Sequence, residues 1–289
     1  MTVPASRLVL LSCLTMIAFA SNSILNRVGI ANGDMNAVDF GIVRLISGAV
    51  MLAVLVLAQS GRLKLLGGNL WVGVSALLAY TFSFSWAYES LDAGLGALIL
   101  FGMVQITMFA GALLGGERPA MQRWLGAGLA FGGLVWLLWP GNAASPSLFH
   151  ALSMAVAGIA WGVYSLHGRG STDPLGATAA NFIWAAVVAG VFGLSQLALP
   201  SSEGLPEATP FGLAMAILCG AVTSGLGYAL WYTVLPNLRS TTAAVAQLTV
   251  PVIAMLGGAL LLSEAVGPRL IIAAALVLGG VLLAVTSRR

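Results

Sequence analysis

Charge is what this sequence lacks most. Only 7% of its 289 residues are Asp, Glu, Lys or Arg, whereas 59% are hydrophobic. An ordinary soluble domain carries roughly 25% charged residues. So few charges cannot cover a folded surface with water-binding groups, so we expect the chain to present its surface to lipid. The net charge of +3 is too small to indicate a nucleic-acid partner.

Motifs that carry chemistry are missing as well. No glycine-rich loop ending in Lys-Ser or Lys-Thr is present, so ATP hydrolysis is not indicated. The two cysteines, Cys13 and Cys219, lie inside apolar runs and do not form a disulfide or metal framework. His150 and His167 lie far from any cluster of Cys or acidic residues. We therefore expect no catalytic residue, no metal site and no cofactor.

Long hydrophilic segments are also absent, and short breaks rich in charge, Pro and Gly separate long apolar runs. Backbone groups in lipid have to be paired within their own segment, so these runs predict helices; continuous runs are not typical of a membrane barrel. We expect an all-α polytopic membrane protein with ten spans: 8–26, 37–59, 70–89, 94–114, 121–139, 148–167, 174–199, 211–234, 240–262 and 268–286.

The first run has a second interpretation. Arg7, the apolar residues after it and Ala18-Phe19-Ala20 imitate a signal peptide with its cleavage site. Cleavage would remove the counterpart of the sixth span, so we expect this run to stay as the first span.

Lys and Arg are distributed unevenly between the two sides. With the amino terminus in the cytoplasm, only Arg27 and Arg269 fall outside and Arg44 falls within the second span, while every other basic residue is cytoplasmic. This bias indicates orientation in a membrane. We expect a multi-pass protein of a bacterial-type inner membrane with both termini cytoplasmic.

The chain also repeats itself. Residues 111–114 and 258–261 both read Gly-Ala-Leu-Leu, a glutamate follows each block three residues later, and Gly132-Gly133 matches Gly279-Gly280 at the same offset of 147. A fixed offset indicates two copies of one unit, residues 1–142 and 143–289. Because each copy holds an odd number of spans, the copies should lie in the membrane with opposite orientation, as in secondary transporters.

Residues 248–264, LTVPVIAMLGGALLLSE, and the Gly-Gly pair in the last span carry a family resemblance. They resemble the EamA type of the drug/metabolite transporter superfamily. The first half carries the pattern more loosely, with Val104 where the second half has Pro251. The aromatic third span is similar to that of the YddG-like amino-acid exporters. The resemblance implies ten helices as two inverted five-helix repeats around a central cavity, and movement of small organic solutes, often outward.

Aromatic residues recur at helical spacing in both halves. Tyr80, Phe84 and Tyr88 share one helix face, an offset of 144 places Tyr228 opposite Phe84, and the sixth span adds Trp161. Rings with polar tips suit an amphipathic solute, although packing and interface anchoring explain them equally well. The aromatic residues that we expect to contact substrate are Tyr80, Phe84, Phe101, Trp161, Tyr164 and Tyr228.

Polar residues within the spans form the second group of candidates. Arg44 either anchors a substrate carboxylate, reaches to the membrane surface or hydrogen-bonds between helices. Asn22, Gln105 and Gln247 either contact substrate or hydrogen-bond between helices. Pro251 is either a gating hinge or a static kink. No acidic residue lies at mid-depth to carry a proton, so the residues favour a facilitator that follows the substrate gradient.

We therefore expect a secondary transporter that exports small amphipathic metabolites, with aromatic or other neutral amino acids first, by alternating access. An organic cation or drug, a nucleoside or a sugar phosphate is the alternative solute. A second alternative is a membrane protein that transports nothing and has a packed centre. The expected partners are the small-molecule substrate and lipid. We expect a monomer, because small-residue pairs such as Gly128/Gly132 and Gly158/Gly162 should serve packing within the bundle.

Overall fold

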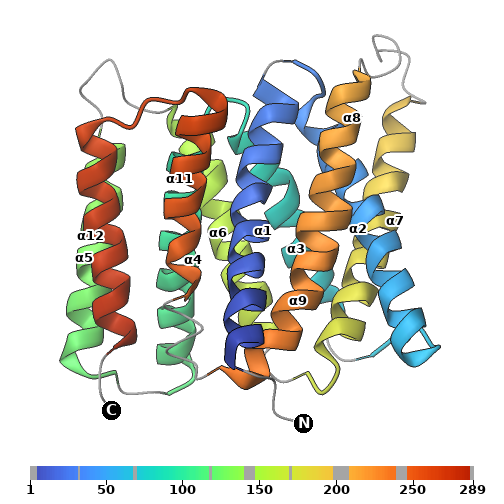
Figure 1. Cartoon of the computed structure of the whole chain (residues 1–289), viewed down its shortest axis with the longest axis horizontal. Helices are drawn as coiled ribbons and strands as arrows, with labels where there is room; N and C mark the ends of the chain where they lie inside the picture. The colour runs from blue at the N-terminus through green and yellow to red at the C-terminus, as the bar shows by residue number, and fades with distance from the viewer. Residues whose placement is uncertain are drawn as a thin grey trace.

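The computed structural model describes residues 5–31, 33–67, 70–116, 119–139, 147–168, 171–197, 208–238 and 246–286, and this part of the chain contains helices and no strand. The helices are α1 (Ala5–Ala31), α2 (Ala37–Ser60), α3 (Leu70–Ala87), α4 (Ala93–Leu114), α5 (Met121–Leu138), α6 (Leu148–Gly168), α7 (Pro174–Leu197), α8 (Pro210–Ile217), η1 (Leu218–Leu226), α9 (Gly227–Val234), η2 (Leu235–Asn237), α11 (Thr249–Leu262) and α12 (Pro268–Val285). Figure 1 shows them as one bundle with both chain ends on the same side.

Eight helices in the described part are long and apolar enough to cross a membrane. They are Ser6–Ala31, Ala37–Ser60, Leu70–Ala87, Ala93–Leu114, Leu148–Gly168, Pro174–Gln196, Pro210–Val234 and Pro268–Val285. The protein is thus a multi-pass membrane protein. The two remaining expected spans correspond to α5, with 18 residues, and α11, with 14 residues, so the count of ten crossings stays a prediction.

The segment Pro210–Val234 is one continuous rod with a π-helix, η1, in its middle. It begins with the Thr209 side chain accepting a hydrogen bond from the Gly212 N–H and with Pro210 in the first turn, where a missing N–H has no consequence. Within η1, Gly220 lies directly against the Arg44 carbonyl and the Ser47 hydroxyl, so a side chain there would keep α2 and η1 apart.

Contacts at the helix ends show how several helices are directed relative to one another. Ala93, the first residue of α4, donates its N–H to Glu264, which follows the end of α11. His150, near the start of α6, lies 3.7 Å from the carboxylate of Glu89, which follows α3. Thr209, which precedes α8, donates its N–H to the Asp34 carbonyl beyond the end of α1. These contacts lie at the upper end of the bundle in Figure 1, and the termini lie at the lower end.

Several contacts between a helix of the first half and a helix of the second half have a counterpart between the corresponding helices of the two halves. As α3 packs on α6, so α1 packs on η1 and α9; as α4 packs on α6, so α1 packs on α11; and α2–α7, α4–α11 and α5–α12 pair directly. Glycines allow the closest approaches, because Gly158 faces the Leu100 carbonyl and Gly126 faces the Gly280 carbonyl. The packing expected for Gly128 and Gly132 is wrong, since both face open space on α5.

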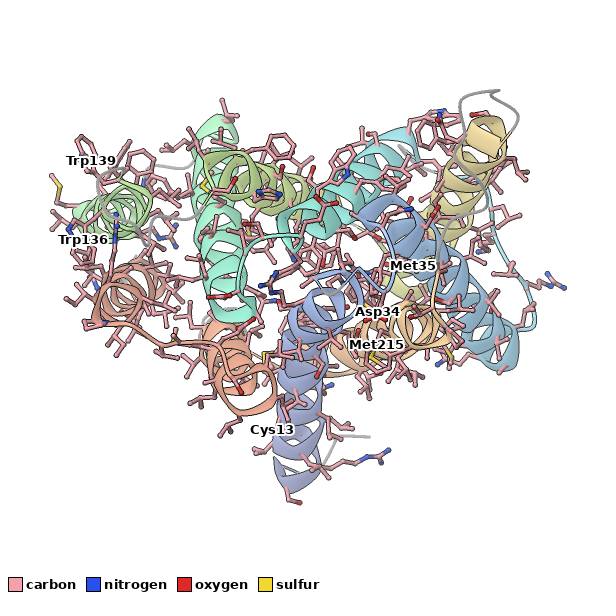
Figure 2. All side chains as sticks on the ribbon, turned by 90° about the horizontal axis from the view of Figure 1, so that it is seen from above. Cys13, Asp34, Met35, Trp136, Trp139 and Met215 are labelled. Carbon is pink, nitrogen blue, oxygen red and sulfur yellow. The ribbon has the colours of Figure 1, made fainter. Side chains whose placement is uncertain are left out.

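Apolar side chains cover the outside of the bundle, and polar side chains lie within it. Trp71, Trp139 and Leu260 are among many large apolar residues that are exposed; Figure 2 shows Trp136 and Trp139 at the outer edge of α5. Among the described residues, the buried polar side chains are Thr15, Asn22, Ser23, Asn26, Arg44, Thr81, Ser85, Thr178, Asn181, Thr223 and Ser224. Lipid facing the outside explains the first group, whereas the second group marks the bundle centre as the place for a site.

Candidate functional site

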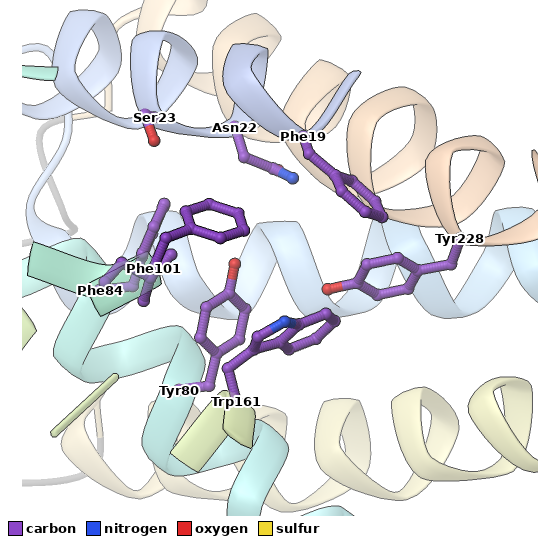
Figure 3. Close-up of a pocket in the computed structure, with 9 residues that line it drawn as sticks. Phe19, Asn22, Ser23, Tyr80, Phe84, Phe101, Trp161 and Tyr228 are labelled. Atoms are coloured by element: carbon purple, nitrogen blue, oxygen red, sulfur yellow. The ribbon is translucent and has the colours of Figure 1, made fainter. Parts of the chain in front are cut away.

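An assembly of aromatic rings fills the centre of the bundle. Tyr80 of α3 has its ring centroid 5.3 Å from Phe84 on the same helix and 5.0 Å from Trp161 of α6. Trp161 stacks on Tyr228 of α9 at 5.2 Å, and Phe19 of α1 lies edge-on to Tyr228 at 5.8 Å. Two helices of the first half of the sequence, α1 and α3, and two of the second half, α6 and α9, thus contribute rings to one cluster (Figure 3).

The rings surround a cavity of about 20 Å³, which has room for about one water molecule. Sites for small molecules usually measure roughly 300–1,000 Å³. The cavity is lined by Phe19, Asn22, Ser23, Tyr80, Phe84, Leu100, Phe101, Trp161 and Tyr228. The space is too small for a solute of amino-acid size, which would fit there only if the surrounding helices moved apart.

Six predicted residues meet at this cavity, namely Asn22, Tyr80, Phe84, Phe101, Trp161 and Tyr228. Tyr164 lies one layer behind, with its ring stacked on Trp161 at 5.5 Å and its hydroxyl in hydrogen bonds with Thr178 and Asn181. Sequence reasoning missed Phe19, Ser23 and Leu100. The signal for Phe19 was its position one helical turn before Asn22, which places both on the same face of α1.

Three other candidates lie away from the cavity. Gln105 of α4 and Gln247, which precedes α11, are half-buried and do not line it. Pro251 lies near the start of α11 (Thr249–Leu262), but Ala246 and Gln247 just before this helix are also helical and Leu248 has αR backbone angles. Whether Pro251 is a gating hinge or a static kink therefore stays a prediction.

Arg44 lies behind the aromatic wall and is 1% exposed. Its Nη2 donates to the Tyr80 hydroxyl at 3.0 Å, and its Nε donates to the Ser224 hydroxyl at 3.3 Å. Its guanidinium carbon lies 5.1 Å from the Tyr80 ring centre and 5.0 Å from that of Phe84. The reach to the membrane surface is excluded for this arginine, and it contacts the cavity through Tyr80.

The charge of Arg44 is not balanced by a carboxylate in the described part of the chain. None of the ion pairs between described residues includes Arg44. Its Nη1 is the one fully buried side-chain nitrogen or oxygen, among the described residues, without a hydrogen-bond partner. A buried cation without a counter-ion is costly in a membrane interior, so such a group indicates function more often than packing.

Asn22 lies on the opposite wall, and its side-chain oxygen is surrounded by donors. Thr223 donates to it at 2.6 Å, the Cys219 thiol at 3.2 Å and Ser224 at 3.3 Å. All three donors belong to η1. The π-helix thereby connects the Asn22 amide to Arg44, because Ser224 bonds both.

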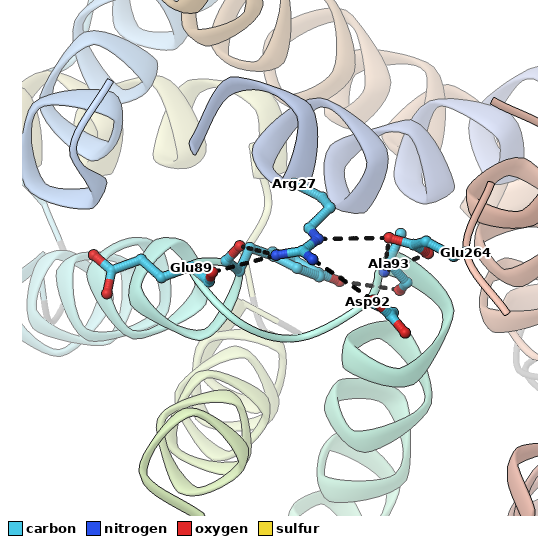
Figure 4. Close-up of polar contacts among 6 residues, drawn as sticks. Arg27, Glu89, Asp92, Ala93 and Glu264 are labelled. Carbon is cyan, nitrogen blue, oxygen red and sulfur yellow. Dashed lines mark hydrogen bonds and ion pairs between the residues drawn. The ribbon is translucent and has the colours of Figure 1, made fainter. Parts of the chain in front are cut away.

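A network of charged side chains joins α1 to the start of α4 and to Glu264 after α11 (Figure 4). Arg27 donates to the carbonyls of Tyr88 and Glu89 at 3.2 and 3.3 Å, and lies 3.6 Å from the carboxylates of both Asp92 and Glu264. Burial raises the pKa of the Glu264 carboxyl group above its ordinary value. The hydrogen bond that Glu264 accepts from the Ala93 N–H lowers this pKa, but by less.

Tyr88 joins this network to the cavity. Its hydroxyl donates to the Ala93 carbonyl at 3.3 Å, and its ring packs edge-on against Phe84 at 4.8 Å. Phe84 lines the cavity. A change in the contacts of Ala93 or Arg27 would therefore shift Tyr88, and Tyr88 would move Phe84 in the cavity wall.

Comparisons with known proteins agree with this architecture. The EamA-like transporter family matches the chain twice, over residues 6–139 and 148–286. The chain is 47% identical over 286 residues to an uncharacterised protein of Pseudomonas aeruginosa, covering 99% of this chain and 96% of that protein. It is 24% identical over 258 residues to the uncharacterised transporter YoaV of Bacillus subtilis, covering 86% and 87% of the two chains.

An uncharacterised transporter of Archaeoglobus fulgidus is 26% identical over 253 residues, with 84% of each chain covered. One solved crystal structure superposes with a TM-score of 0.65 at 19% identity and covers 96% of this chain and 97% of its own, which supports the fold alone. The two family matches together span most of the sequence, and the chain therefore belongs to the EamA-like transporter family, whose members are transporters and not enzymes.

Proposed function

We propose that this protein exports small amphipathic metabolites, with aromatic or other neutral amino acids first, as the YddG-like exporters do. Residues 1–142 and 143–289 are two inverted five-helix units, and the cavity between them opens to one side of the membrane at a time. The observation that carries the proposal is the composition of the aromatic cluster. Tyr80 and Phe84 come from the first unit, while Trp161 and Tyr228 come from the second.

The helix directions support the inverted relationship. Helix α4 begins at the end of the bundle where α11 ends, and α5 ends where α12 begins, since Arg269 of α12 donates to the carbonyls of Trp136 and Trp139. These are the helices that the sequence repeat pairs with each other. Opposite directions in paired helices are expected when two copies with an odd number of spans follow one another.

The small volume of the cavity supports alternating access. The cluster leaves only about 20 Å³ free, so a solute can enter only when the two units move relative to each other. The Arg27 and Glu264 network holds α1, α4 and α11 together above the cavity, which makes it the closed gate of the upper end.

The direction in the membrane follows from the basic residues. Arg7, Arg62, Lys64 and Arg123 belong to the lower end of the bundle, to which both termini also belong. Basic residues favour the cytoplasmic side, so we assign the lower end to the cytoplasm of a bacterial-type inner membrane. The described acidic residues lie at helix ends or in turns, which favours a facilitator without a proton carrier at mid-depth.

Counterflow of labelled neutral amino acids into proteoliposomes tests the proposal. Wild type is expected to exchange phenylalanine, tryptophan or a similar amino acid. The double variant Trp161→Ala with Tyr80→Ala is expected to lose this exchange, because it removes both sides of the 5.0 Å ring contact. Trp71→Ala serves as the matched control, since Trp71 is 69% exposed on the outside of α3. Absence of exchange by wild type, or unchanged exchange by the double variant, contradicts the proposal.

A further inference from the structure

Five side chains with polar groups line the cavity, namely Asn22, Ser23, Tyr80, Trp161 and Tyr228. Two of them, Asn22 on α1 and Tyr80 on α3, lie on opposite walls and have hydrogen bonds behind the wall (Figure 3). Each could present either a donor or an acceptor to a solute. Their hydrogen bonds behind the cavity wall decide which one faces inward, and these bonds can be followed back to groups with only one possible role.

Tyr80 receives its hydrogen bond from Arg44. A guanidinium group can only donate, so the bond from Nη2 uses the phenolic oxygen of Tyr80 as acceptor. The hydrogen of the phenol therefore points away from Arg44. Figure 3 shows the phenolic oxygen turned toward the space between Tyr80 and Asn22. Tyr80 thus offers an O–H donor to a solute.

The orientation of Asn22 is fixed in the same way. The Asn26 amide nitrogen donates to the Asn22 backbone carbonyl at 3.1 Å, which can only accept, and also to the Cys219 sulfur at 3.1 Å. The Cys219 thiol then donates to the Asn22 side-chain oxygen. Ser224 accepts from Arg44 and donates to the same oxygen. The oxygen of Asn22 is occupied, and its nitrogen end faces the cavity (Figure 3).

A positively charged group has weaker partners at this cavity, namely the hydroxyl oxygens of Ser23 and Tyr228. No Asp or Glu of the described chain lines the cavity. The ring faces that could hold a cation have other partners, because Arg44 lies over Tyr80 and Phe84, and Trp161 is stacked on both Tyr164 and Tyr228. The positive charge of Arg44 also opposes an ammonium group at this distance.

We propose that the cavity recognises the carboxylate of its solute through the Tyr80 hydroxyl and the Asn22 amide, and does not recognise an α-amino group. Aromatic monocarboxylates that lack the amino group are therefore substrates alongside the matching amino acids. Arg44 is the positioning residue that sets both donors and supplies the positive potential. This inference rests on the transport function proposed above and narrows its substrate class to carboxylates.

The experiment compares three compounds that carry the same phenyl ring and differ in their charged groups. Proteoliposomes loaded with labelled phenylalanine are exposed to unlabelled phenylalanine, to 3-phenylpropionate, which lacks the amino group, or to 2-phenylethylamine, which lacks the carboxylate. We expect 3-phenylpropionate to drive exchange with a KM within about threefold of phenylalanine. The amine is expected to be at least about tenfold weaker, because the bonds to a charged acceptor are lost.

Tyr80→Phe adds a test that isolates the hydroxyl group. It keeps the ring and removes the donor, so KM for both carboxylates is expected to rise about tenfold while their ratio stays constant. Tyr232→Phe is the matched control, because the Tyr232 hydroxyl accepts from Thr178 and does not line the cavity. This control is expected to keep the wild-type KM values.

The outcomes separate the two proposals. Exchange of phenylalanine without exchange of 3-phenylpropionate overturns the inference and leaves amino-acid transport standing. Preference for the amine, or an unchanged KM in Tyr80→Phe, also overturns it. Exchange of none of the three compounds by folded wild-type protein overturns the transport of aromatic solutes and the inference together.

Discussion

Both carboxylate oxygens of Glu264 accept a hydrogen bond from the backbone N–H of Ala93, at 3.0 and 2.9 Å. This contact joins the residue after α11 to the first residue of α4, where an anion is also favoured by the helix dipole. Arg27 lies 3.6 Å away on the other side of the carboxylate. The contact between the start of α4 and the end of α11 thus depends on one half-buried acid that can bind a proton.

Glu264 should make stability depend on pH. Since burial raises its pKa, the folded protein holds this proton more tightly than the unfolded chain does. The contribution to the free energy of unfolding is present below the ordinary pKa of 4.5 and is lost as the pH rises through the raised value. Glu264→Gln does not titrate and should lose this part of the pH dependence. Thermal unfolding from about pH 4 to about pH 8 checks it; identical pH profiles for the two proteins would contradict it.

Arg44 offers a substitution that separates transport from stability. Arg44→Met has a similar length but no charge and no donors, so carboxylate transport is expected to fall by at least about tenfold. The same change removes a buried cation without a counter-ion, so the thermal unfolding temperature should stay equal or rise. Arg44→Lys keeps the charge but cannot hold Tyr80 and Ser224 in the same geometry, and transport should fall there too. Wild-type transport by Arg44→Met would exclude its role at the cavity.

Gly220 should tolerate no side chain. A Cβ atom there would collide with the Arg44 carbonyl and the Ser47 hydroxyl, so Gly220→Ala is expected to destabilise the protein by roughly 1–3 kcal/mol. Gly128→Ala is the matched control, because no atom lies within 4 Å of that position. It should leave the unfolding temperature unchanged or slightly raised, since alanine favours a helix. Equal unfolding temperatures for both variants would show that α2 and η1 are not in close contact.

Cysteine labelling tests which end of the bundle faces the cytoplasm. Single cysteines at Glu89 and at Arg62, both exposed, should react differently with a membrane-impermeant maleimide in intact cells. We expect labelling at position 89 without treatment and at position 62 only after permeabilisation. Cys13 is replaced by Ser in this background, while Cys219 is buried and can stay. The reverse pattern would invert the proposed topology.

The sequence predicted best what depends on spacing along a helix. Tyr80 and Phe84 lie one turn apart and meet at the cavity, and the offset between the halves pointed to Tyr228, which reaches the same place. Such features follow from the helical period and from repetition. They require no knowledge of which helix lies beside which.

The features that sequence reasoning missed depend on contacts between helices. Gly128 and Gly158 look alike in sequence, yet only Gly158 faces a neighbouring helix. The sequence could not separate the two glycines, because it does not show which face of α5 meets another helix. Arg44 hydrogen-bonds Tyr80 and Ser224 of two other helices, and its contact with a substrate stays a prediction. The polar partners Ser224 and Cys219 carried no recognisable pattern, since their role arises only where η1 lies against α1 and α2.

The nine residues of η1 have π-helical geometry. In a π-helix, donor and acceptor of each backbone hydrogen bond are five residues apart, whereas they are four apart in an α-helix. Conversion to α geometry would shift the hydrogen-bonding register by one residue, which corresponds to a rotation of about 100°. Ser224 lies within η1 and Tyr228 lies just beyond it. A change of register inside this segment would therefore turn Tyr228 relative to Ser224 and move an aromatic wall without breaking the rod that carries it.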